Sequence, residues 1–261
     1  MHLDVVDLRA FYYRTRLGRF AQSVLQRALK SLWPETAGQT VVGFGFAAPL
    51  LRPFLDRSGQ VISLMPAQQG VMPWPGGAAN TSCLVEETKW PLAAGSVDRL
   101  VIHHGLETCE SPDALVEEIW RVLAPGGSVV IVAPNRSGLW ARADGTPFGY
   151  GRPYSRSQLE ELLRRHRLYP ERERTALYAP PSQRPFWLKT ARMWERIGGR
   201  LGSQLVAGVL IVEATKQVYV LPKGGAADAV KSPLEVLEGL TRPKPKPVPS
   251  RLVRRRKFGP N

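Results

Sequence analysis

The chain has 261 residues, of which 43% are hydrophobic and 22% charged, a balance typical of one globular α/β domain with appendages. Its longest apolar run, residues 205–212, contains a glycine and is far shorter than the ~20 residues of a membrane-spanning helix. The first residues lack the basic and apolar stretches of a signal peptide, so we expect a protein that is soluble or at most peripheral to a membrane. Cys83 and Cys109 fit neither a disulfide framework nor a zinc site, which favours a reducing, cytoplasmic setting.

The net charge of +14 is concentrated at one end of the chain. Residues 241–261 contain eight Lys or Arg and no acid, which leaves 28 basic and 22 acidic residues in the first 240. Alternating Pro and Lys in residues 243–249 favours extended polyproline II. We therefore expect residues 223–261 to form a disordered, basic, Pro-rich tail. It is either a solvated extension or a weak, salt-sensitive contact for nucleic acid or an anionic membrane.

The chain begins with a helical segment. Residues 4–32 repeat apolar side chains at the spacing of one helical face, and Gly18 is the expected break between two pieces. Trp33-Pro34 stops this pattern. Residues 1–39 are therefore predicted to form an N-terminal helical cap.

The middle of the chain alternates strands and helices. The predicted strands are residues 40–42, 60–64, 98–103 and 128–133. The predicted helices are residues 48–55, a segment capped by Ser111 with Pro112 at its first position, residues 155–168, and residues 187–201. Pro125-Gly126-Gly127 is expected to terminate the second helix, and Ser155 with Gln158 fits a capping box.

This alternation predicts a parallel sheet with helices on both faces, within a domain of residues 40–222. Residues 210–221 are expected to close the fold with two apolar stretches. Ligands of such sheets lie beyond the carboxyl ends of the strands, so the loops after Val42, Leu64, Thr88 and His103 are the candidate site.

Two sequence blocks and a glycine turn carry a family resemblance. The turn, Val41-Val42-Gly43-Phe44-Gly45-Phe46-Ala47, joins a predicted strand to a helix. The first block is Glu86, then Trp90-Pro91-Leu92, then Gly95-Ser96-Val97-Asp98. The second block is Arg121-Val122-Leu123-Ala124-Pro125-Gly126-Gly127 before an apolar strand. In this order and spacing the chain resembles class I S-adenosylmethionine-dependent methyltransferases, especially the type 11-like group that methylates small molecules.

The resemblance implies a Rossmann-like, seven-stranded, mostly parallel sheet with a final antiparallel hairpin. It also implies roles for particular residues. Gly43 and Gly45 would border the methionine part of S-adenosylmethionine, and Met65 stands where strand two normally ends in the acid that binds the ribose. Glu86 would lie near the adenine, and His103 or His104 would face the sulfonium and the substrate.

The sequence departs from the family pattern at three positions. Val41 replaces an acid, Ala47 replaces the third glycine, and Leu64 or Met65 replaces the acid that ends strand two. A ribose diol without that acceptor loses roughly 1.5–3 kcal/mol, or about one to two decades of affinity. The sequence therefore predicts weakened cofactor binding within an intact fold.

A distinctive segment, residues 134–154, follows the last predicted parallel strand. Its candidate substrate residues are Arg136, Trp140, Phe148, Tyr150 and Arg152. Such a loop either closes over a substrate, with arginines on a carboxylate or phosphate, or packs its aromatic side chains onto the domain.

His104 is the candidate general base because imidazole titrates near neutrality, and a buried structural histidine is the alternative. Glu107 fits an orienting carboxylate or a solvated helix residue equally well. Residues 11–13, Phe-Tyr-Tyr, either form a lid or serve helix packing. No third ligand at metal spacing accompanies the histidines, so we expect no metal site.

Two functions follow as hypotheses. The first is methyl transfer from S-adenosylmethionine to a small, anionic molecule. The alternative is a catalytically inactive, methyltransferase-like binding or regulatory protein, suggested by the three departures from the family pattern.

Overall fold

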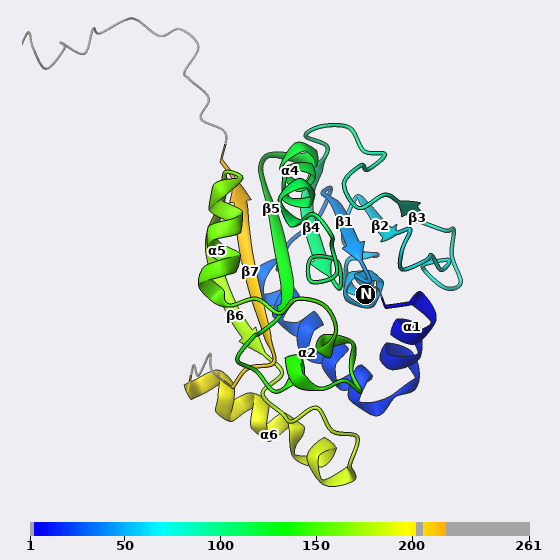
Figure 1. Ribbon diagram of the computed structural model, residues 1–261. Helices are drawn as coiled ribbons and strands as arrows, with labels where there is room; N and C mark the ends of the chain where they lie inside the picture. Colours follow the sequence, from blue (N-terminus) through cyan, green and yellow to red (C-terminus); the bar gives the residue numbers. More distant parts are fainter. Residues whose placement is uncertain (1–2, 202–205, 218–261) are drawn as a thin grey trace, which may run out of the picture. The chain divides into compact units, whose positions relative to one another are not determined.

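A computed structural model describes residues 3–201 and 206–217. These residues form one seven-stranded sheet with the strand order β3-β2-β1-β4-β5-β7-β6 (Figure 1). The strands are β1 (Thr40–Gly45), β2 (Gln60–Pro66), β3 (Ser82–Val85), β4 (Val97–His103), β5 (Leu123–Pro134), β6 (Leu168–Ala176) and β7 (Val209–Lys216). Strands β1 to β5 pair in parallel, whereas β7 runs antiparallel to both β5 and β6. The predicted fold class is confirmed.

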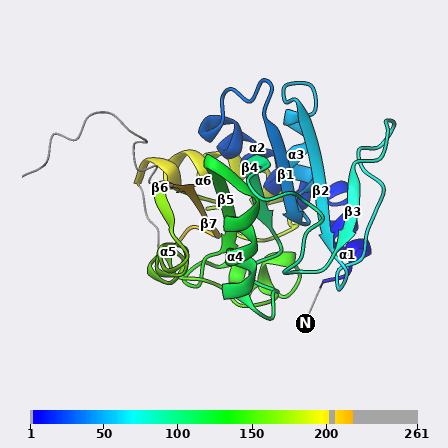
Figure 2. The same cartoon turned by 90° about the horizontal axis from the view of Figure 1, so that it is seen from above.

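Helices cover both faces of this sheet (Figure 2). They are α1 (Val5–Arg14), α2 (Arg16–Leu32), α3 (Ala48–Leu51), α4 (Pro112–Val122), α5 (Arg156–Arg165) and α6 (Pro185–Leu201). Short 3₁₀ turns are η1 (Arg52–Phe54), η2 (Trp140–Arg142) and η3 (Pro147–Gly149). Helices α2 and α3 lie on one face, and α4 and α5 lie on the other.

The central strands are apolar on both sides because they feed two cores. Val41 belongs to the cluster that α1, α2 and α3 complete, whereas Val42 and Phe44 belong to the cluster on the side of α4 and α5. Side chains alternate between the faces of a strand, so consecutive apolar residues are needed at these positions. Val101 and Val130 share the face of Val41, which places the predicted strands in one domain.

The break between the first two helices lies at Thr15, not at the predicted Gly18. The Thr15 hydroxyl donates to the Phe11 carbonyl and accepts from the Gly18 N–H, so Thr15 ends α1 and caps α2. A Cβ at Gly18 would lie 2.0 Å from the Phe11 carbonyl oxygen. Gly18 therefore lies in the first turn of α2, where it permits close approach to the end of α1.

The strand that pairs with β7 was not predicted. Residues 210–221 were expected to hold both closing stretches, but β7 pairs instead with Leu168–Ala176. The residues of β6 are largely polar and partly exposed, because an edge strand buries little. The predicted helix 155–168 therefore ends earlier, at Arg165, while its Ser155–Gln158 capping box is confirmed. Residues 218–221 lie outside the described residues, as does the predicted tail 223–261.

Two further local expectations need correction. Pro125-Gly126-Gly127 does not terminate α4; the helix ends at Val122, and these residues form the irregular start of β5. The short strand β3 was missed because its four residues are mostly exposed. Ser111 precedes α4 as predicted, although its side chain makes no capping hydrogen bond.

Within the described residues, no helix is long and apolar enough to cross a membrane. The same part of the chain holds no group of three or more His, Cys, Asp or Glu residues that could bind a metal ion. Cys83 is exposed, Cys109 is buried, and both are free.

Candidate functional site

The strand order reverses direction between β1 and β4, which makes the crevice at their carboxyl ends the expected ligand position. Gly45 and His103 are register partners at this point. Side chains of the protein itself fill the crevice, and we call them the crevice cluster: Tyr12, Phe46, His103, His104 and Phe148. None of the five is more than 1% exposed.

Tyr12 connects α1 to the end of β4. Its hydroxyl lies 2.8 Å from Nε2 of His103 and 2.8 Å from Nε2 of His104. A phenol carries one proton, so it donates to one imidazole and accepts from the other. The buried polar atoms of Tyr12 and of both Nε2 positions are therefore satisfied by one another.

Aromatic packing closes the crevice from two sides. The Tyr12 ring stacks on Phe46, with centroids 5.8 Å apart and an interplanar angle of 24°. The Phe148 ring lies 4.8 Å from the ring of His104 and 5.2 Å from that of Trp140. The crevice thus lies between the N-terminal helix and the segment that follows β5.

Helix α1 is also attached to the loop after β2. The N–H of Val5 donates to the Gln69 carbonyl at 2.7 Å, and the Gln69 side chain donates to the backbone carbonyl of His104. Gln69 is only 3% exposed. The helix is therefore anchored at its first turn by Gln69 and further along by Tyr12.

Burial sets the charges in this site. It lowers the pKa of His104 to about 3 and lowers the pKa of His103 well below its usual value. It raises the pKa of Glu107, whose carboxylate lies 3.0 Å from Nδ1 of His104, to about 7. Both histidines are uncharged at neutral pH, and a base with a pKa near 3 removes protons poorly at that pH. The backbone of His104 is also strained, with φ at +50°.

The glycines of the turn contact protein backbone and side chains. A Cβ at Gly43 would lie 2.6 Å from Cβ of Ala47, at the start of the helix that packs on β1. Gly45 has φ at +79°, and a Cβ there would lie 2.3 Å from the His103 carbonyl oxygen. These glycines therefore allow α3 and β4 to approach β1 closely, and both are buried.

The predicted ribose and adenine positions differ from each other in exposure. Met65 is 1% exposed, and its sulfur accepts from the N–H of Met72 at 3.5 Å. It offers no oxygen to a ribose diol. Glu86 is exposed directly after the last residue of β3, and it pairs with Lys89 in an isolated β-bridge.

The segment after β5 places its aromatic and basic residues on opposite sides. Trp140 is fully buried and donates to the Ala179 carbonyl at 2.8 Å, and Tyr150 is half-buried against the same core. Arg136 and Arg152 are exposed and form no ion pair within the described residues. The segment therefore covers the crevice with its rings, while its arginines face outward.

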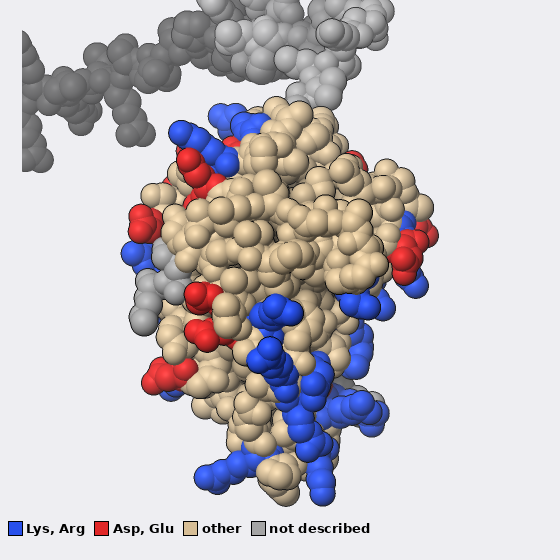
Figure 3. Space-filling model, turned by 90° about the vertical axis from the view of Figure 1, so that its right-hand side faces the viewer, with Lys and Arg blue, Asp and Glu red and all other residues tan. Residues whose placement is uncertain are grey.

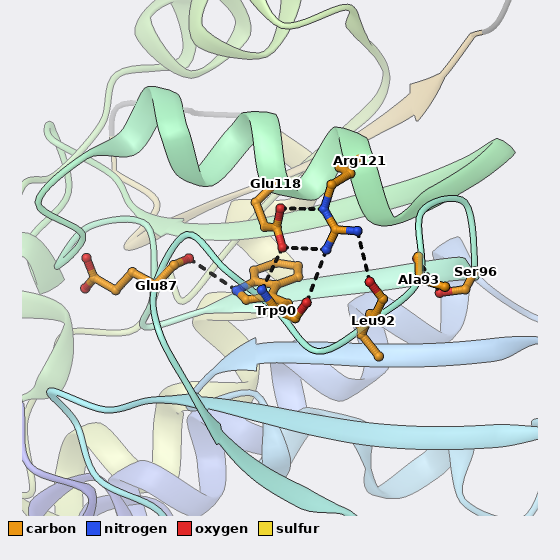
Figure 4. Close-up of polar contacts among 7 residues, drawn as sticks. All are labelled: Glu87, Trp90, Leu92, Ala93, Ser96, Glu118 and Arg121. Carbon is orange, nitrogen blue, oxygen red and sulfur yellow. Dashed lines mark hydrogen bonds and ion pairs between the residues drawn. The ribbon is translucent and has the colours of Figure 1, made fainter.

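Polar contacts join the two blocks that carry the family resemblance (Figure 4). The Glu118 carboxylate accepts from the Trp90 N–H at 2.7 Å and from Nε of Arg121 at 2.7 Å. Arg121 also donates to the carbonyls of Leu92 and Trp90. These residues hold the segment before β4 against α4, so the two blocks have a structural role in the fold.

The outer side of α1 is basic, unlike its inner side. Lys and Arg gather on the lower part of the face that Figure 3 shows, which carries α1. A groove of about 480 Å³ there is lined by residues that include Arg9, Tyr13, Arg14, Arg52 and Trp74. The helix thus separates an apolar, aromatic crevice from a cationic surface.

Residues 43–131 match a family model described as a methyltransferase domain. A possible histamine N-methyltransferase from Thermotoga maritima has a TM-score of 0.52 and 17% identity, over 77% of this chain and 92% of its own. A putative methyltransferase in complex with the Trm112 activator of Haloferax volcanii has a TM-score of 0.54 and 17% identity, over 84% and 100%. The [4+2]-cyclase SpnF has a TM-score of 0.51 and 18% identity, over 74% and 80%. No curated protein matches the chain.

The fold is that of the class I methyltransferases. Residues 43–131 are similar to the methyltransferase domain family, and the solved structures that match the chain share this fold.

Side chains of the protein occupy the crevice in which the resemblance places S-adenosylmethionine. Met65, to which the resemblance assigns the position of the ribose acid, is buried, and the space beyond Gly45 and His103 holds Tyr12, Phe46 and Phe148. Sequence reasoning did not single out Phe46 or Gln69. The signal for Phe46 was a bulky aromatic residue between Gly45 and Ala47, where a turn that approaches a ligand needs a small side chain.

Proposed function

We propose that this protein uses the methyltransferase fold as a binding or regulatory scaffold and does not transfer methyl groups through the β1–β4 crevice. The observation that carries the proposal is the hydroxyl of Tyr12 between His103 and His104, where it fills the ligand position of the fold. The fold itself does not decide the activity, because unrelated functions share folds and one similar structure is a [4+2]-cyclase.

The energetics favour a closed crevice. An aromatic side chain buries about 150–250 Å², so withdrawing Tyr12 costs about 4 kcal/mol or more of apolar burial. A ligand that must first open the crevice is weakened by about a thousandfold on this account alone. The missing ribose acceptor at Met65 removes about one to two further decades. A cofactor of micromolar intrinsic affinity would therefore bind only above millimolar concentration.

Calorimetry and thermal unfolding with S-adenosylmethionine and S-adenosylhomocysteine test this proposal. We expect neither heat nor a rise in Tm for the wild type at millimolar ligand. Tyr12→Ala opens the crevice, and Tyr12→Ala with Met65→Asp also restores a carboxylate for the ribose. Cofactor binding by the double variant alone would support a scaffold descended from a cofactor site. Micromolar binding by the wild type, with release of S-adenosylhomocysteine, would overturn the proposal.

Methyl transfer to a small anionic molecule is the second candidate. The methyltransferase domain match favours it, and so do the exposed guanidinium groups of Arg136 and Arg152 at the carboxyl edge of β5. In this candidate α1 moves away to admit the cofactor, and the two arginines bind the acceptor's carboxylate or phosphate. Its test is the same titration, followed by methylation assays in which Arg152→Gln raises KM for anionic acceptors only.

A further inference from the structure

Helix α6 is held on the domain by one face. It follows the carboxyl end of β6, and β7 begins beside that end, so α6 lies at the same edge of the sheet as the crevice (Figure 1). Ala191 is 2% exposed, and a Cβ at Gly198 would lie 2.2 Å from the Tyr178 ring. The Glu195 carboxylate accepts from the N–H groups of Leu177, Tyr178 and Ala179, that of Tyr178 at 2.6 Å. These contacts fix which side of α6 faces outward.

The outward side of α6 is apolar. Phe186 is 64% exposed, Met193 49%, Trp194 37% and Ile197 43%. These four residues recur at helical spacing and form one stripe, which we call the α6 stripe. Isolated exposed apolar residues are common on soluble proteins, but four large ones on one helical face mark an interaction surface.

Basic residues flank the α6 stripe on one side. Lys189, Arg192 and Arg196 are exposed and form no ion pair within the described residues. At the helical repeat their positions follow one another along the same flank. The single acid of the helix, Glu195, is turned inward toward residues 177–179. The outward half of α6 is thus a cationic and apolar surface with a tryptophan at its border.

We propose that α6 docks on an anionic lipid surface, with the α6 stripe among the acyl chains and the basic flank on the headgroups. Aromatic and apolar side chains opposite a Lys/Arg-rich flank are what helices that lie in a membrane interface need. A second copy of this chain is disfavoured, because each copy carries a net charge of +14 and the same basic flank. The proposal does not depend on the state of the crevice.

Co-sedimentation of the full chain with vesicles tests the proposal. We expect binding to vesicles of phosphatidylcholine with phosphatidylglycerol and little binding to phosphatidylcholine alone. A chain truncated after Leu240 lacks the basic tail, and we expect it to retain anionic-vesicle binding that salt weakens. Equal binding to both vesicle types, or complete loss of binding on truncation, would overturn the assignment to α6. So would a chain that binds acidic proteins but no anionic vesicle.

Matched charge-reversal variants distinguish the basic flank of α6 from exposed basic residues elsewhere on the domain. Lys189→Glu with Arg192→Glu should weaken anionic-vesicle binding by about thirtyfold or more. Arg57→Glu with Arg164→Glu makes the same charge change on exposed residues before β2 and β6, at the opposite edge of the sheet, and should weaken it far less. Equal losses in the two pairs would contradict a docking role for α6.

The apolar contact has its own readout. Vesicles with brominated acyl chains should quench part of the tryptophan fluorescence, and Trp194→Phe should remove that quenching while binding persists. Phe186→Ser with Met193→Ser should abolish binding, whereas Val71→Ser with Leu84→Ser, exposed at 45% and 49% elsewhere, should not. Unchanged quenching in Trp194→Phe would place the membrane contact away from α6.

Discussion

The crevice at the ends of β1 and β4 and the outer face of α6 lie at the same edge of one sheet, yet they are opposites. The crevice is where ligands of this fold bind, and the chain fills it with buried side chains, among which the Tyr12 hydroxyl is hydrogen-bonded to both histidines. The outer face of α6 lies away from the expected site, and there four large apolar side chains remain uncovered. The difference teaches that the family motifs identify the fold, whereas the exposure of apolar side chains identifies a surface that is free to bind a partner.

The largest expected effect comes from removing the centre of the crevice cluster. Tyr12→Ala should lower the free energy of unfolding by about 4 kcal/mol, because it leaves a cavity and two imidazoles without their partner. Tyr12→Phe keeps the ring and should cost about 1–3 kcal/mol. Tyr13→Phe, on the exposed side of α1, is the matched control and should change stability by less than about 0.5 kcal/mol. Urea unfolding measures all three, and a small effect of Tyr12→Ala would mean that the crevice is open in solution.

A pair of glycine variants tests the close contact between β1 and β4. Gly45→Ala should destabilise the protein by about 3 kcal/mol, since the methyl group meets the His103 carbonyl and φ is positive. Gly95→Ala has a similar positive φ of +70° but no neighbour within 4 Å, so it should cost only the backbone strain, about 1–2 kcal/mol. Equal losses of stability would show that the turn does not pack against β4 as described.

The pH dependence of stability tests the buried charges. His103 and His104 bind protons in the unfolded chain below pH 6.5 but not in the folded protein, because burial lowers their pKa values. Glu107 has a pKa raised from 4.5 to about 7, so only the folded protein holds its proton between these values. Between pH 4.5 and 6.5, unfolding therefore takes up about two protons and releases about one, and these groups make stability fall by about 1.4 kcal/mol per unit of decreasing pH.

Glu107→Gln isolates one part of this balance. The variant cannot release a proton, so its stability should fall more steeply than that of the wild type, by about a further 1.4 kcal/mol per pH unit in the same window. Parallel urea titrations of the two proteins cancel the contributions of all other groups. Identical slopes would mean that Glu107 ionises normally and is not buried beside His104.

The smallest expected effect belongs to the outer face of α6. Phe186→Ser with Met193→Ser should change the free energy of unfolding by less than about 0.5 kcal/mol, because both side chains are exposed. Thermal unfolding checks this, and circular dichroism shows that the helix persists. A loss of several degrees in Tm would mean that the stripe packs on the domain. The outer face of α6 would then be a packed surface, as the crevice is.

The comparison also separates what could be predicted from what could not. The alternation of apolar runs and the Ser155–Gln158 capping box are local patterns, and both correspond to elements of the structure. The blocks around Trp90 and Arg121 pointed to the fold because their contacts with Glu118 hold it together. Contacts that hold the fold together do not show which ligand binds. The binding and catalytic roles therefore remain predictions for Gly43, Gly45, Met65, Glu86 and His104.

By itself the sequence determined the layered α/β fold, because helical and strand periodicities are read within a few residues and the two cores require apolar side chains on both faces of β1, β4 and β5. It also showed an apolar residue, Met65, at the end of the second strand, where the resemblance predicts an acid. Only the tertiary structure decided what occupies the crevice, because Tyr12 and His103 are 91 positions apart and meet through the docking of α1. It likewise decided that β6 pairs with β7 and that the α6 stripe faces outward, since both depend on contacts between distant segments that no local pattern encodes.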